Sequence, residues 1–137
     1  MQRIAIILNK NLDKGQVGNI SCIFMGQAAI CHPEIYDSAV LLDKNENRHA
    51  AIRYSTVLLK ANGQGQLLNL VKRVHVEYPS MTCVLFSQVG QGLHNAFGEY
   101  QRQIVSSSSE ELTPVGVLVL GDEENVRLVT KKFSLLK

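Results

Sequence analysis

Short apolar runs alternate along this chain with longer segments whose apolar residues recur at helical spacing. The first run, Ile4–Leu8, is strand-like, and the polar stretch Asn9–Gly15 separates it from an apolar segment over residues 16–30. One face of that segment carries Val17, Ser21, Phe24 and Ala28, and a second carries Gly18, Cys22, Met25 and Ala29. These intervals predict a helix. Because small or apolar residues lie on most of its sides, we expect most of its surface to be covered.

A hairpin is predicted next, because two extended segments, 38–42 and 49–54, flank the polar residues 43–48. The following apolar run, Thr56–Leu59, is too short for a helix. We therefore expect it to continue the strand of residues 49–54 after a bend near Ser55.

Helical spacing returns in the second half of the chain. Residues 62–65 open a helix that ends at Tyr78–Pro79. A continuous apolar run, Met81–Phe86, predicts a buried strand. Residues 87–92 are predicted to form a loop before a third helix. The apolar positions of that helix are Leu93, Ala96, Phe97, Tyr100 and Ile104.

The chain is predicted to end with a strand and a helix. Ser106–Glu111 is a low-complexity patch, which indicates a mobile loop. Val115–Leu120 is predicted to be the last buried strand. A final helix starts at Gly121–Asp122, and its apolar residues face the sheet. These residues are Val126, Val129 and Phe133.

The predicted elements run strand, helix, hairpin, helix, strand, helix, strand, helix, which is typical of an α/β domain of two or three layers. Alternating strands and helices favour parallel pairs joined by crossover helices, and the hairpin is expected to make the sheet mixed. A length of 137 residues fits one domain over residues 1–137. In such sheets, functional groups gather where strands end and helices begin.

Composition narrows the class of protein. A hydrophobic content of 45% with 19% charged residues is typical of a soluble globular domain, and the apolar runs are too short to cross a bilayer. The chain start lacks the features of a secretory signal, so a cytoplasmic location is expected. A net charge of +2 and a pI near 8.5 do not indicate the basic surface that is typical of nucleic-acid-binding domains.

The number and spacing of the cysteines predict buried reduced thiols. The chain has an odd number of cysteines and no C-x-x-C spacing, and they are Cys22, Cys31 and Cys83.

Two segments resemble a known enzyme family. Lys14–Asn19, after a strand of valine and isoleucine type, resembles the glycine- and lysine-rich helix start of type II peptidyl-tRNA hydrolases, and the ending from 115–121 into an acidic helix start resembles them too. The hairpin and the segment 86–100 look more like an uncharacterised family of small bacterial proteins related to those enzymes. The resemblance spans nearly the whole chain in element order. It implies a type II peptidyl-tRNA-hydrolase-like fold, with a small mixed sheet and helices packed on it.

Several side chains differ from those of the hydrolases. Gln16 stands where those enzymes have a catalytic-type lysine, with Lys14 as a displaced substitute. Ile20 and Ile23 stand at and near the family's glutamine and histidine. The family's aspartate and threonine fall in the loop 87–92. The resemblance therefore implies the fold more directly than it implies peptidyl-tRNA hydrolysis.

With this fold, the helix start at 14–19 and the loop 87–95 should meet at one edge of the sheet. Their polar residues are the candidate ligand-binding residues Lys14, Gln16, Asn19, Ser87, Gln91, His94 and Asn95. Amides, a hydroxyl, a lysine and a histidine suit a small polar or nucleotide-type ligand. A hydrolase would use His94 as general base and Lys14 to stabilise an oxyanion or phosphate. The alternative interpretation is a set of solvated loop residues.

Other chemistry has weaker support in the sequence. A cysteine nucleophile would have to be Cys31 beside His32, at a helix end where the helix dipole disfavours a thiolate. The histidines occur singly on separate elements, so no metal site and no cofactor are predicted. They are His32, His49, His75 and His94.

Three functions remain open from the sequence. The first is binding of a small ligand at the edge where the first strand meets the first helix, with hydrolase-like chemistry if any. The second is a non-catalytic homodimeric interaction module, whose subunits would meet through the small face of the first helix. The third, peptidyl-tRNA hydrolysis, rests on analogy of fold.

Overall fold

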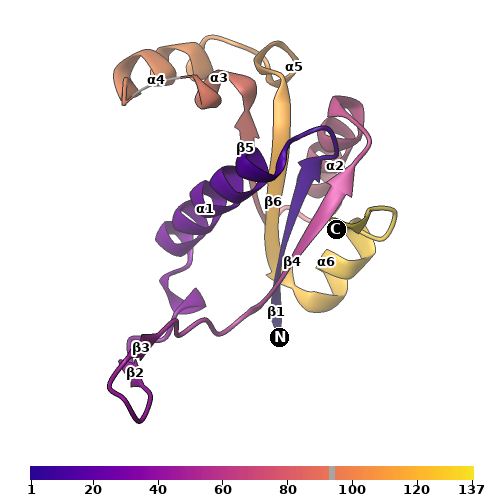
Figure 1. Cartoon of the computed structure of the whole chain (residues 1–137). Helices are drawn as coiled ribbons and strands as arrows, with labels where there is room; N and C mark the ends of the chain where they lie inside the picture. The colour runs from indigo at the N-terminus through magenta and orange to yellow at the C-terminus, as the bar shows by residue number, and fades with distance from the viewer. Residues whose placement is uncertain (93–94) are drawn as a thin grey trace.

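A five-stranded sheet lies between one long helix on one face and two helices on the other (Figure 1). The computed structural model describes residues 1–92 and 95–137. The strands in spatial order are β5 (Thr82–Ser87), β6 (Pro114–Asp122), β1 (Gln2–Asn9), β4 (Ser55–Ala61) and β7 (Ser134–Leu135). The helices on the sheet are α1 (Lys14–Cys31) on one side and α2 (Gln64–Glu77) and α6 (Glu123–Val129) on the other.

The sheet is mixed, as predicted, but for a different reason. β1 and β4 run parallel, whereas β6 runs antiparallel to both β1 and β5, and β7 runs antiparallel to β4. The hairpin does not join this sheet. Its strands β2 (Leu41–Leu42) and β3 (Arg48–His49) form a separate two-stranded ribbon that projects from the body (Figure 1).

The assignment of the run Thr56–Leu59 to the hairpin was wrong. These residues belong to β4, which pairs with β1 over the whole of its length. A strand in the middle of a sheet is covered on both faces, so a short unbroken apolar run is what such a strand needs. The sequence pattern does not reveal this pairing, because α1 and the hairpin separate β1 from β4 along the chain.

The helix α1 is confirmed, and its first turn is closed by a capping box. The Asp13 carboxylate accepts a hydrogen bond from the Gln16 backbone N–H at 2.8 Å, and the Gln16 side-chain oxygen accepts one from the Asp13 N–H at 3.0 Å. The buried face carries Ile20, Phe24 and Ala28. The expectation that most of this helix is covered was wrong, since Gly18 and Cys22 lie on an exposed face and Ile30 is 77% exposed.

The second half of the chain contains more helix than its sequence predicted. The loop predicted at 87–92 contains α3 (Gln88–Gln91), and the third helix, α4, covers Phe97–Val105. The predicted mobile loop at 106–111 runs into α5 (Ser109–Leu112), whose first turn is closed by a capping box between Ser108 and Glu111. The strand predicted at 115–120 is confirmed within β6, but β7 follows it, so it is not the last strand.

The expected burial of the thiols holds for only one of the three. Cys22 and Cys31 are exposed, because they lie on sides of α1 away from the sheet, whereas Cys83 lies half-buried in β5. Burial raises the pKa of the Cys83 thiol to about 11. Within the part of the chain that the structure describes, no helix is both long and apolar enough to span a membrane.

Candidate functional site

Three strands end at the same edge of the sheet. β1 and β4 are parallel, and β5 has the direction of β1 because both run antiparallel to β6. The starts of α1 and α3 therefore lie at one end of the molecule, uppermost in Figure 1. The topology therefore places the helix start at 14–19 and the start of α3 at the same end of the sheet, where β1 and β5 end.

A hollow of about 530 Å³ lies where β1 and β4 end. It is lined by Lys10, Leu12, Lys14, Val17, Lys60, Leu136 and Lys137. The Lys10 backbone N–H donates to the Ala61 carbonyl at 2.9 Å, and the Leu136 N–H donates to the Leu58 carbonyl at 3.1 Å. These bonds fix the loop after β1 and the C-terminal segment against β4. We call this space the lysine hollow.

The lysine hollow is cationic on its rim and apolar on its wall. Four of its seven lining residues are lysines, and the other three are Leu12, Val17 and Leu136. Among the residues that the structure describes, the ion pairs involve none of these four lysines. Uncompensated ammonium groups around one space attract an anion. The apolar wall adds a surface for the organic part of such a ligand.

Of the predicted residues that the structure describes, only Lys14 lines the lysine hollow. Gln16 is held in the capping box of α1 and Asn19 is exposed on the same helix. Ser87 is 4% exposed and lines a different hollow of about 300 Å³ beneath α4 and α5. The predicted residues in the described part of the chain thus lie at one end of the sheet but do not line one cleft.

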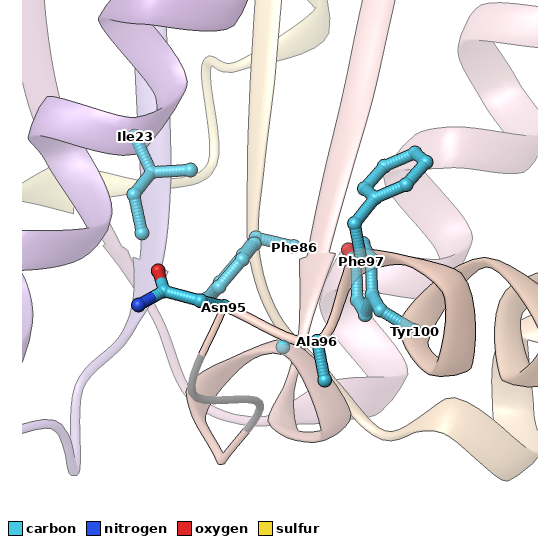
Figure 2. Close-up of a pocket in the computed structure, with 7 residues that line it drawn as sticks. Ile23, Phe86, Asn95, Ala96, Phe97 and Tyr100 are labelled. Carbon is cyan, nitrogen blue, oxygen red and sulfur yellow. The ribbon is translucent and has the colours of Figure 1, made fainter.

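Gln91 and Asn95 lie near α3 and α4. Gln91 is the exposed last residue of α3, and His94 lies outside the described residues. Asn95 lines a third hollow of about 360 Å³, which we call the aromatic hollow (Figure 2). The residues around it are Ile23, Phe86, Gly90, Asn95, Ala96, Phe97 and Tyr100.

Both ring nitrogens of His32 have partners other than Cys31, its neighbour in sequence. Its Nε2 atom lies 2.6 Å from the Thr82 hydroxyl, and its Nδ1 atom lies 3.1 Å from the Glu34 carboxylate. A backbone hydrogen bond, followed by the bond from His32, lowers the pKa of Glu34. The Cys31 sulfur instead accepts a hydrogen bond from Gln27 at 3.6 Å. His32 therefore ties the end of α1 to β5 rather than serving Cys31 as a base.

Metal-ligating residues are not gathered at this edge. In residues 1–92 and 95–137, no group of three or more histidine, cysteine or acidic side chains could hold a metal ion. None of the seven residues that line the lysine hollow has a histidine or acidic side chain. Its side chains can hold negative charge, and they do not form a general-base site.

Sequence reasoning missed Lys10, Lys60 and Lys137 as site residues. Lys60 follows the apolar run Thr56–Leu59, whose sequence resembles a continuation of the hairpin. The correct register sets Lys60 opposite Leu8 and Ala61 opposite Asn9, so Lys60 lies beside the end of β1. A parallel pairing of the first and fourth strands would have revealed the cluster.

Comparisons with known proteins identify a family and a solved structure whose functions are unknown. A family model described as "Protein of unknown function (DUF2000)" matches residues 2–137. A solved structure of a protein of unknown function from Agrobacterium tumefaciens is similar to this chain, with a TM-score of 0.85 and 20% sequence identity over 99% of this chain and 98% of that one. No curated protein matches the sequence. The prediction of an uncharacterised family is confirmed, and the relation to type II peptidyl-tRNA hydrolases stays a prediction.

Proposed function

The chain belongs to the DUF2000 family, whose function is unknown, and we propose that it binds a small phosphate-bearing ligand of nucleotide type in the lysine hollow. One observation carries this proposal. Four lysines surround one hollow at the carboxyl ends of a parallel strand pair, and the lining contains no acidic side chain. The crevice outside the carboxyl ends of strands is the usual ligand position in α/β sheets.

The lysine charges set an upper limit on the binding of phosphate alone. An ammonium group about 5 Å from a phosphate oxygen contributes at most about 1 kcal/mol at the high effective dielectric constant of a solvent-facing hollow. Four such contributions, about 4 kcal/mol together before the cost of association, correspond to a Kd no tighter than about 1 mM. Burial of the organic part against Leu12, Val17 and Leu136 strengthens the binding of a phosphate ester beyond that of the free anion.

The proposed activity is binding without hydrolysis. Lys14 lines the hollow, and its proposed role is to supply positive charge to the ligand. We also propose that the fold is of the type II peptidyl-tRNA-hydrolase kind, and the order of elements and the helix start at 14–19 support this. The activity of those enzymes is not carried over, because Gln16, Ile20 and Ile23 replace their working side chains.

A titration with pyrophosphate tests the proposal. Isothermal titration of the wild-type chain is compared with Lys14→Gln and Lys60→Gln, and with Lys44→Gln as a control. Lys44 lies in the exposed hairpin turn, so its substitution makes the same charge change far from the hollow (Figure 1). Each hollow variant should weaken binding about fivefold, as expected for the loss of about 1 kcal/mol. Equal affinities in all four proteins, or no binding by the wild type, would overturn the proposal.

The second candidate function is a homodimeric interaction module, and the outer face of α1 favours it. After Lys14 the helix has no charged residue, and a Cβ added at Gly18 or Gly26 would meet no atom within 4 Å. Helical glycine costs about 0.8–1.0 kcal/mol relative to alanine, and contacts within the chain do not require it here. Small residues permit a second helix to approach closely.

Sedimentation velocity over a range of protein concentrations tests this second candidate. A chain that dimerises through this face should become monomeric when Gly18 and Gly26 are both changed to leucine, because the bulk prevents close approach. The double variant should keep the far-UV circular dichroism of the wild type. A wild-type monomer at every concentration would exclude the dimer.

A further inference from the structure

The aromatic hollow lies on the other side of α1 from the lysine hollow and plays no part in the proposed function. Ile23 of α1 forms one wall, Phe86 at the end of β5 lies in the middle, and Phe97 and Tyr100 of α4 lie on the far side (Figure 2). Figure 2 shows the Asn95 amide turned toward Ile23. The hollow therefore combines aromatic walls with one amide group.

Its apolar walls are open to solvent. Phe97 is 69% exposed and Ile23 is 42% exposed, although Phe86 between them is only 8% exposed. Tyr100 is half-buried, and this burial raises the pKa of its hydroxyl. Exposed aromatic surface that continues into a buried ring is characteristic of a binding hollow rather than of a solvated helix face.

The backbone of α3 approaches two aromatic rings of the hollow closely at Gly90. A Cβ on Gly90 would lie 2.7 Å from two ring carbons of Phe86 and 3.3 Å from the Tyr100 ring, so only glycine lets both rings close against α3. Asn95 has a φ of 60°, in the left-handed region that asparagine adopts more readily than most non-glycine residues. This conformation sets the position of the Asn95 amide at the rim.

We propose that the aromatic hollow binds a neutral, planar aromatic or heteroaromatic ring. Three aromatic side chains favour a flat π-system through edge-to-face and offset contacts. None of the seven lining residues is charged, which disfavours an ion. A volume of about 360 Å³ lies at the small end of the range for ligand sites and suits one or two fused rings. The Asn95 amide offers both a donor and an acceptor to the polar edge of such a ring.

Indole is the probe for this site. It is neutral and planar, with one N–H donor, and its fluorescence can be followed because the chain contains no tryptophan. Phe97→Ala removes the most exposed wall, and Val105→Ala on the same helix is the control, since Val105 is 78% exposed and does not line the hollow. Loss of an aromatic contact should weaken indole binding about fivefold in Phe97→Ala. The control should bind as the wild type does.

The role of the amide is tested separately. Asn95→Gly retains the left-handed backbone while removing the side chain. It should weaken the binding of indole but leave that of N-methylindole, which has no donor, unchanged. Absence of indole binding by the wild type, or equal binding by Phe97→Ala and the wild type, would overturn the proposal. Equal binding of indole and cyclohexanol would also overturn it, because a merely apolar groove, such as one that seats a partner's side chain, would not distinguish flat from puckered rings.

Discussion

Substitution of Gly116 by alanine should displace α1 from the sheet. Gly116 lies in β6 directly beneath this helix, and an added Cβ would lie 2.7 Å from Leu8 Cδ2 and 3.0 Å from Phe24 Cε2. The Ile7 carbonyl oxygen would lie 3.3 Å away. Leu8 and Phe24 are 0% and 1% exposed, so neither side chain has free space into which it can move. The methyl group can be accommodated only if the helix or the strand shifts.

The expected cost follows from two opposing effects. Overpacking of a closed core costs about 1–3 kcal/mol. Replacing glycine in a strand interior recovers about 0.5–1 kcal/mol of backbone entropy. The midpoints of these ranges, about 2 and about 0.75 kcal/mol, give a net loss of unfolding free energy of about 1.25 kcal/mol, which lowers the Tm by about 4 °C for a chain of 137 residues. Because α1 forms a wall of both hollows, Gly116→Ala should also weaken the binding of pyrophosphate and of indole.

Thermal unfolding followed by circular dichroism measures this effect, with Gly121→Ala as the control. Gly121 lies in the same strand, but the three atoms nearest to its added Cβ all belong to Met81, with Cγ nearest at 3.2 Å. A methionine side chain is flexible, so the control should lose less than about 1 kcal/mol. If Gly116→Ala is as stable as the wild type, or if the two variants lose equal stability, the close seating of α1 on β6 is wrong.

Two further predictions concern the thiols and the hairpin. At neutral pH, Cys22 and Cys31 should react with a disulfide reagent while Cys83, with its pKa raised to about 11, reacts only after unfolding; equal rates for all three would contradict the burial described. The hydrogen bond from His49, at 2.8 Å, is the largest cause that lowers the pKa of Asp43. This hydrogen bond stabilises the hairpin at pH values above the pKa that Asp43 has in the unfolded chain. The stabilisation is lost as the pH falls through the lowered pKa that Asp43 has in the folded chain. His49→Ala should raise the Asp43 pKa in an NMR titration, and an unchanged value would refute this coupling.

Local patterns predicted most of the elements correctly. The spacing that predicted α1 and the turn that predicted the hairpin depend on neighbours in sequence, and both elements are confirmed. Pairing of distant segments was harder to predict, because an apolar run such as Thr56–Leu59 has the same composition in a hairpin as in a central strand. The short helix α5 was missed because a run of serines resembles a loop, although Ser108 and Glu111 have the spacing of a capping box.

The candidate site was predicted only in part, for the same physical reason. Lys14, at the strand-to-helix junction, lines the lysine hollow. Lys60 joins it only through the parallel register of β1 and β4, which is a long-range pairing. Gln16 closes the capping box of α1, a local role that its sequence does not distinguish from binding a polar ligand, because the same side-chain type serves both.

The most direct test of the phosphate-binding proposal is a map of backbone amide shifts in the ¹⁵N-labelled chain during a titration with pyrophosphate. We expect the largest shifts at Lys10, Lys14 and Lys60, with small shifts at Ala96 and Tyr100 in the aromatic hollow. The shifts should shrink at high salt, because the attraction is electrostatic. Shifts confined to residues outside the lysine hollow, or no shifts at millimolar pyrophosphate, would contradict the proposed function.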